Sequence, residues 1–142
     1  MKPQAHYGGE IAKSGCLFLS ILDIIEEKTG VLISDSDVEQ IYKKAVDALA
    51  ITEKCFVTNH SALGDIAIDH YWLKGRFLYK GAFYMPWMPG KYQNWGDISG
   101  SDSVIIQGKV LGAHSHFFRP AYNPAPELTI PLILSVRGYK IV

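Results

Sequence analysis

Cysteine is scarce in this chain of 142 residues: only Cys16 and Cys55 are present, too few for a fold held together by disulfide bonds. The sequence does not decide whether these two cysteines form one disulfide bond with each other. No uninterrupted apolar run approaches the ~18 residues that a membrane-spanning helix needs, and the N-terminus, Met1–His6, lacks the apolar run of a secretory signal. We therefore expect a chain without a membrane span that is located in the cytoplasm, although export by another route would leave no mark.

An excess of charge is also missing. The 14 Lys and Arg residues balance 14 Asp and Glu residues, and no basic run or stripe is present, which argues against nucleic acid as a partner. Low-complexity segments and internal repeats are absent from the sequence. With 48% hydrophobic and 20% charged residues, the composition is that of a folded protein, and we expect residues 1–142 to form one domain.

The first half of the chain has helical periodicity. Apolar residues recur at a spacing of 3.6 from Ser14 to Lys28, with Ser14 as the expected cap and residues 1–13 irregular before it. A second helix is predicted from a cap within Ser34–Asp37 to about Leu49, with Leu49 facing inward. A third is predicted to start at Asn59–Ser61 and to run to Leu73.

After Gly75 the sequence becomes aromatic and then strand-like. Pro86 precedes the aromatic segment from Trp87 to Trp95 and Pro89 lies within it, so regular structure is excluded there. We expect the segment to be either a lid packed on the sheet or one wall of a substrate cleft. Helices first and strands last predict an α+β fold, in which N-terminal helices carrying Cys16 pack on a C-terminal, mainly antiparallel β-sheet. The predicted strands are residues 76–84, 103–110, 112–119, 128–136 and 138–142.

Cys16 lies where the first of these helices is predicted to begin. The unpaired amides and the positive dipole end of a helix lower the pKa of a thiol, so a cysteine there can act as a nucleophile when a histidine lies opposite it. The alternative is that Cys16 is a small buried residue of a core helix, because free cysteine is among the most buried residue types.

Two histidines, His114 and His116, share one face of a predicted strand. Either of them can be the base for Cys16, or both can be exposed strand residues. The pair could instead bind a metal ion, but no cysteine or carboxylate at metal-ligand spacing supports that alternative. In that case further ligands would come from the remaining candidates, His6, His60, His70 and Cys16.

A cysteine nucleophile also needs a residue that orients its histidine and donors that stabilise an oxyanion. Asn123 follows the histidine strand closely and can accept a hydrogen bond from an imidazole N–H, or it can be a turn residue before Pro124. Gln4 can donate a side-chain N–H to the oxyanion beside the backbone N–H of Cys16, or it can be merely solvated.

Four features, taken in this order, resemble the papain-like cysteine peptidase superfamily. They are Gln4, the Gly15-Cys16 pair at the start of an apolar helix, His116-Phe117 on a late strand, and Asn123-Pro124. The closest likeness is to its bacterial branch, related to bacteriocin-leader peptidases and to cell-wall peptidases of the NlpC type. The resemblance implies that Cys16 is the nucleophile, His116 the general base and acid, Asn123 the orienting residue and Gln4 the oxyanion donor. It also implies a papain-like fold, no cofactor, and a peptide, isopeptide or peptidoglycan-type substrate.

We therefore favour a cysteine peptidase or amidase. The alternative from another functional class is a binding or assembly module that keeps the same fold with an inactive site. It is motivated by the long interval between Gln4 and Cys16 and by the short one between His116 and Asn123. The identity of the substrate and the oligomeric state are left open.

Overall fold

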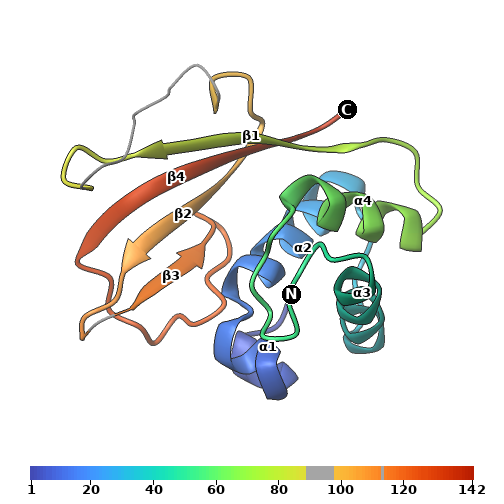
Figure 1. The fold of residues 1–142 in the computed structure, drawn as a ribbon, viewed down its shortest axis with the longest axis horizontal. Helices are drawn as coiled ribbons and strands as arrows, with labels where there is room; N and C mark the ends of the chain where they lie inside the picture. Colours follow the sequence, from blue (N-terminus) through green and yellow to red (C-terminus); the bar gives the residue numbers. More distant parts are fainter. Residues whose placement is uncertain (89–97, 113) are drawn as a thin grey trace.

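The structure is a computed structural model that describes residues 1–88, 98–112 and 114–142 (Figure 1). Within these ranges the helices come first and the strands follow, and no helix there is both long and apolar enough to cross a membrane. The helices are α1 (Gly9–Ser14), α2 (Cys16–Thr29), α3 (Asp35–Asp47) and α4 (His60–His70), after a 3₁₀ turn at Gln4–Tyr7. The strands are β1 (Phe77–Tyr84), β2 (Ser103–Lys109), β3 (Ser115–Phe118) and β4 (Leu132–Ile141).

The described strands form one antiparallel sheet in the order β1-β4-β2-β3, so β1 and β3 lie at its two edges. The helices gather on one side of this sheet, with α2 beside β3 and α4 beside β1 (Figure 1). The predicted α+β fold, with the cysteine-bearing helices packed on an antiparallel sheet, is therefore confirmed.

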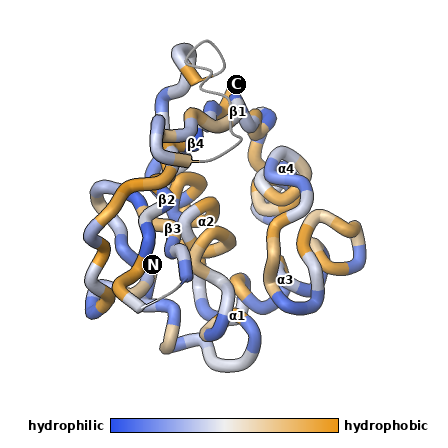
Figure 2. The backbone as a smooth tube through the Cα atoms, turned by 60° about the vertical axis from the view of Figure 1, so that its left-hand side comes forward, coloured by the Kyte–Doolittle hydropathy of each residue, from blue (hydrophilic) through white to orange (hydrophobic). Residues whose placement is uncertain are grey.

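Helix α2 lies at the centre of the molecule. A helix that is apolar on nearly all sides must be buried, and the hydrophobic colouring of Figure 2 runs along α2 and the neighbouring strands. The sheet contributes Phe77, Ile105, Phe117 and Tyr139 to the same core. The buried residues of α2 are Phe18, Leu19, Ser20, Ile21, Leu22, Ile24 and Ile25.

The start of α2 is set by Gly15, which separates it from α1. A Cβ atom at this position would lie 2.5 Å from the carbonyl oxygen of Ile11, so only glycine fits. Two predictions for this region are wrong. Residues 1–13 are not irregular, because Gly8 and Gly9 adopt positive φ angles of 70° and 54° and allow a tight turn into α1. Ser14 belongs to α1, and the N-cap of α2 is Gly15, which makes no side-chain capping bond.

The next two helices begin where the sequence predicts. Ser34 accepts a hydrogen bond from the Asp37 amide at 3.1 Å, and Asn59 accepts one from the Ala62 amide at 3.0 Å. The inward position predicted for Leu49 is wrong, since α3 ends at Asp47 and the Leu49 side chain is 81% exposed.

The last two predicted strands are one strand, β4, and residues 128–131 lie before it. Gly138 is therefore not a break. It is a point of close approach, because a Cβ atom there would lie 2.1 Å from the Ser101 hydroxyl oxygen. At the other edge, β3 is shorter than predicted and begins at Ser115, which leaves His114 outside the strand.

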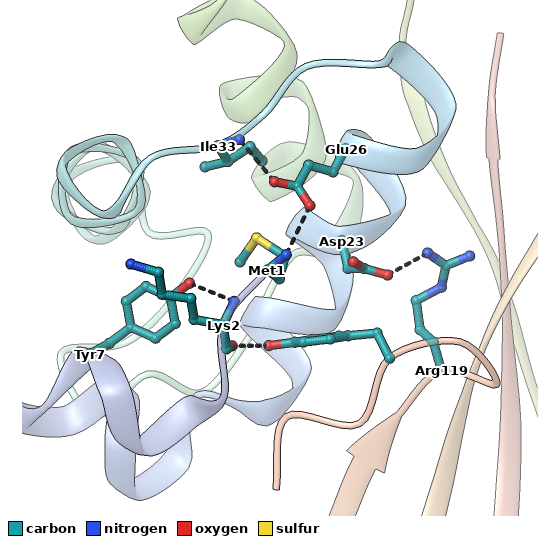
Figure 3. Close-up of polar contacts among 8 residues, drawn as sticks. Met1, Lys2, Tyr7, Asp23, Glu26, Ile33 and Arg119 are labelled. Atoms are coloured by element: carbon teal, nitrogen blue, oxygen red, sulfur yellow. Dashed lines mark hydrogen bonds and ion pairs between the residues drawn. The ribbon is translucent and has the colours of Figure 1, made fainter. Parts of the chain in front are cut away.

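Polar contacts bind the N-terminal segment to α2 and to the turn after β3 (Figure 3). The N-terminal ammonium group of Met1 lies 3.1 Å from Glu26, and the Lys2 carbonyl accepts a hydrogen bond from the Tyr122 hydroxyl at 2.7 Å. Arg119, at the end of β3, contacts Asp23 of the same helix. These contacts hold the N-terminal segment, the turn after β3 and the second half of α2 together.

Arg119 should be the most costly of these side chains to remove. It is 6% exposed and pairs with Asp23 at 2.8 Å and Glu27 at 2.7 Å, so Arg119→Ala leaves Asp23, itself largely buried, without its partner. We expect the free energy of unfolding to fall by about 3 kcal/mol. Urea denaturation of this variant and of the control Arg76→Ala measures the effect. Arg76 is 76% exposed beside Asp65, so its loss should cost less than about 1 kcal/mol, and equal losses would contradict the prediction.

Candidate active site

Cys16 is the first residue of α2, and its sulfur contacts the edge of the sheet. The backbone amide of Phe117, on β3, donates a hydrogen bond to Cys16 Sγ at 3.4 Å. The first amides of a helix have no partner within the helix, so the thiol also lies among unpaired backbone donors. This arrangement favours negative charge on the sulfur and on any oxygen atom bonded next to it.

His116 is 2% exposed and is held by Asn123. Its Nε2 lies 2.7 Å from Asn123 Oδ1, and the same oxygen accepts a hydrogen bond from the Ala125 amide at 3.0 Å. A backbone amide can only donate, so the Ala125 bond requires oxygen at that position of the Asn123 side chain. Nε2 must then carry the hydrogen in the neutral imidazole, which leaves the Nδ1 lone pair available as a proton acceptor.

Gln4 is 7% exposed, not solvated, and two hydrogen bonds fix it. Its backbone amide donates to the Pro124 carbonyl at 2.7 Å, and its side-chain Nε2 donates to the Ala12 carbonyl at 2.9 Å. A glutamine amide has two N–H groups, so one of them remains after the bond to Ala12. Asn123-Pro124-Ala125 therefore holds His116 through its first residue and Gln4 through its second.

A cleft with a volume of about 790 Å³ joins these residues. Gln4, Cys16 and His116 line it. Asn123 is not a lining residue but forms a hydrogen bond with His116. The structure thus brings together the four residues that the sequence predicted for one site, although they are spread over most of the chain. His60, Phe117 and Arg137 also line this cleft.

Burial acts on the two ionisable groups of the site. It raises the pKa of the Cys16 thiol, and hydrogen bonds from backbone amides, including that of Phe117, act in the opposite direction without outweighing it. Burial also lowers the pKa of His116, against the opposing effect of the Asn123 hydrogen bond. The expectation of a lowered thiol pKa is therefore wrong for this conformation, because desolvation outweighs the helix start. Both shifts favour the neutral form, thiol and imidazole, at neutral pH, and no hydrogen bond between Cys16 and His116 is found among the described residues.

The other candidate residues lie outside this arrangement or take no visible part in it. His114 lines the cleft but is exposed, and it is His116 that contacts Asn123. The metal alternative finds no support, since the described part of the chain holds no group of three His, Cys, Asp or Glu residues that could bind an ion. His6 and His70 contact Asp35 and Asp37 instead.

Two further predictions concern the surroundings of the cleft. Trp87 is not one of its lining residues, and its indole N–H donates to the Ile133 carbonyl at 2.8 Å. Residues 89–95 of the aromatic segment lie outside the described residues. Cys55 lines the cleft as a free, buried thiol, so the bridge to Cys16 that the sequence left open is not formed. Burial raises the pKa of Cys55 to about 12.

Comparisons of the chain with protein-family models, with curated proteins and with solved structures find no match. The chemistry of the site must therefore be argued from its own geometry. The sequence did not predict that His60 or Arg137 would lie in the same cleft as Cys16. The His60 ring stacks on Tyr79 at 4.1 Å, and its Nδ1 lies 2.9 Å from the hydroxyl of Tyr139. No short-range signal could reveal partners that lie so far along the chain.

His60 should make stability depend on pH. Burial, aided by the positive charge of Arg137, lowers its pKa from 6.5 to about 4. Below pH 6.5 His60 therefore binds a proton in the unfolded chain but stays neutral in the folded protein. The free energy of unfolding then falls as the pH drops toward 4. We expect the wild-type protein to lose about 3 kcal/mol more than His60→Gln between pH 7 and pH 4.

Denaturant unfolding at several pH values measures this difference. His114→Gln is the matched control, because it makes the same substitution at an exposed histidine instead of a buried one. The same pH dependence in His60→Gln and in the wild-type protein would contradict the assignment.

Proposed function

We propose that this protein is a papain-like cysteine hydrolase that cleaves a peptide, isopeptide or related amide bond, with Cys16 as the nucleophile. The observation that carries the proposal is the hydrogen bond from His116 Nε2 to Asn123 Oδ1 at 2.7 Å, beside a cysteine at a helix start in the same cleft. It leaves Nδ1 of His116 free for the thiol proton, which is the arrangement that nucleophilic catalysis by cysteine requires.

In the first step Cys16 Sγ attacks the carbonyl carbon of the substrate while His116 Nδ1 accepts the thiol proton. Because both groups are neutral at rest, the proton moves as the carbon–sulfur bond forms. The carbonyl oxygen becomes an oxyanion, which the Cys16 backbone N–H and the second Nε2–H of Gln4 stabilise. The resulting imidazolium is held by Asn123.

In the second step the carbon–nitrogen bond breaks. His116 gives its proton to the nitrogen of the leaving amine, and the acyl group remains on Cys16 as a thioester. A water molecule then gives a proton to neutral His116 and attacks the thioester carbon. Collapse of this second tetrahedral intermediate releases the carboxylic acid product, and the proton returns to Cys16 Sγ. No cofactor takes part in this sequence.

A binding or assembly module with an inactive site is the second candidate function. It is favoured by the raised pKa of Cys16 and by the lack of a hydrogen bond between Cys16 and His116 in the described structure. In such a module the cleft would hold a peptide without cutting it, and His116 and Asn123 would serve only to order the turn after β3.

Removal of His116 separates the two candidates. If His116 accepts the thiol proton, iodoacetamide should alkylate Cys16 about 100-fold more slowly in His116→Ala at pH 7. Rates at Cys16 and Cys55 can be followed separately by mass spectrometry. Removal of the exposed residue His114 in His114→Ala should leave the Cys16 rate within a factor of about three, since it lacks the bond to Asn123. Equal Cys16 rates in the wild-type protein and in His116→Ala would favour the binding module.

Gln4 should matter for acyl transfer but not for alkylation, because alkylation forms no oxyanion. In Gln4→Met, which keeps the length of the side chain, acylation of Cys16 by an activated ester such as p-nitrophenyl acetate should fall about 100-fold. Alkylation of Cys16 by iodoacetamide should change little in the same preparation. If both reactions slow equally, Gln4 acts only by holding the N-terminal segment, and its role as an oxyanion donor is excluded.

A further inference from the structure

Arg137, on β4, is a cleft residue that the proposed mechanism does not use. It lines the same cleft as Cys16, and its guanidinium group lies 4.8 Å from the centre of the Phe117 ring. Phe117 is also the residue whose amide contacts Cys16 Sγ. Arg137 and Cys16 therefore line one cleft and share Phe117 as a neighbour, Arg137 through its ring and Cys16 through its amide.

The partners of Arg137 are all neutral. Its Nη1 donates to Gln107 Oε1 at 3.2 Å and to the hydroxyl of Ser135 at 2.5 Å. The Tyr84 ring lies 5.9 Å away, and the neighbouring imidazole, His60, is uncharged at neutral pH because its pKa is about 4. Among the described residues no carboxylate forms an ion pair with Arg137, although Glu127 also lines the cleft.

The other two arginines of the chain are different. Arg76 pairs with Asp65, and Arg119, which is the more buried, pairs with both Asp23 and Glu27. In the described residues Arg137 alone among the arginines lacks a carboxylate, although it is partly buried. A buried or half-buried charged side chain normally has a partner of opposite charge. The lack of such a partner distinguishes Arg137 from Arg76 and Arg119.

The guanidinium group is also held in place before any ligand arrives. Gln107 Oε1 accepts hydrogen bonds from both Ser135 and Arg137, and the Phe117 ring supports one face of the guanidinium plane. Nη1 donates to Gln107 and Ser135, and the Arg137 side chain also forms a hydrogen bond with Tyr79. A guanidinium has five N–H donors arranged to match the two oxygens of a carboxylate, so these neutral partners do not use all of them. A fixed, incompletely used guanidinium in a cleft is suited to bind that group.

We propose that Arg137 forms a carboxylate-binding subsite of the cleft. The substrates of this protein are then peptides that carry a free carboxylate close to the bond attacked by Cys16. This inference rests on the proposed function, since it uses Cys16 as the reacting group. The carboxylate comes either from an acidic side chain or from a C-terminus, and the same guanidinium recognises both.

Reagents that carry the carboxylate to Cys16 test the subsite. Iodoacetyl-alanine is compared with its amide, and iodoacetyl-glutamate α-amide with iodoacetyl-glutamine α-amide, so that each pair differs only in charge. We expect at least one carboxylate reagent to alkylate wild-type Cys16 about tenfold faster than its neutral partner at physiological salt. The pair that shows this preference identifies the source of the carboxylate.

Variants then assign the preference to Arg137. It should fall to about one in Arg137→Gln and be intermediate in Arg137→Lys, which keeps a charge but loses the planar donors. Lys13→Gln is the matched control: it removes one positive charge from an exposed side chain at the cleft, and the preference should survive. If Arg137→Gln does not fold, the wild-type protein and Arg137→Lys give the answer.

Three results would overturn the subsite: no preference for either carboxylate in the wild-type protein, a preference that persists in Arg137→Gln, or one that Lys13→Gln removes equally. The proposed function has a separate readout, the rate of the neutral reagents at Cys16. If this rate is the same in the wild-type protein and in His116→Ala, the hydrolase fails whatever the preference. If His116→Ala slows the neutral reagents but charge has no effect, only the subsite fails.

Discussion

The contact between the start of α2 and the edge of β3 is the junction on which the rest of the cleft depends. At this point the Phe117 amide donates to Cys16 Sγ, and it connects residues that are 101 positions apart in the chain. Because β3 is an edge strand, one row of its backbone groups is not used by the sheet and is available to the helix. The side chains on either side of Phe117 then have little freedom, and His116 is directed toward the turn that contains Asn123.

That turn is the second support of the site. Asn123-Pro124-Ala125 contacts His116, Gln4 and its own backbone within three consecutive residues. The N-terminal segment is therefore positioned by the far end of the chain, and the ion pairs between Arg119 and α2 hold the same region from the other side (Figure 3). Displacement of one part would move the proposed base and the proposed oxyanion donor together. Two contacts of high sequence separation, from Phe117 to Cys16 and from Gln4 to Pro124, thus bring the parts of the site together.

Local patterns predicted the secondary structure well where caps and periodicity agree. A cap within Ser34–Asp37, a helix start at Asn59–Ser61 and the apolar run of α2 depend only on neighbouring residues, and these predictions are confirmed. Two of the errors involve glycines. The sequence predicts that residues 1–13 are irregular, yet the positive φ angles of Gly8 and Gly9 open a helix. It also predicts two strands, 128–136 and 138–142, where Gly138 lies inside one continuous strand that Ser101 approaches. A glycine indicates freedom of the backbone, but only the packing around it decides how that freedom is used.

The sequence by itself determined the order of helices and strands, the caps of α3 and α4, and the identity of four residues whose catalytic roles stay predictions. These features follow from side-chain periodicity and from short motifs. Only the tertiary structure decided that Gln4 is buried against Pro124, that His116 rather than His114 contacts Asn123, and that Arg137 lies in the cleft without an anion. It also reversed the expected direction of the Cys16 pKa. The physical reason is that desolvation and hydrogen bonding depend on which surfaces meet, and those surfaces come from residues that are distant in the chain.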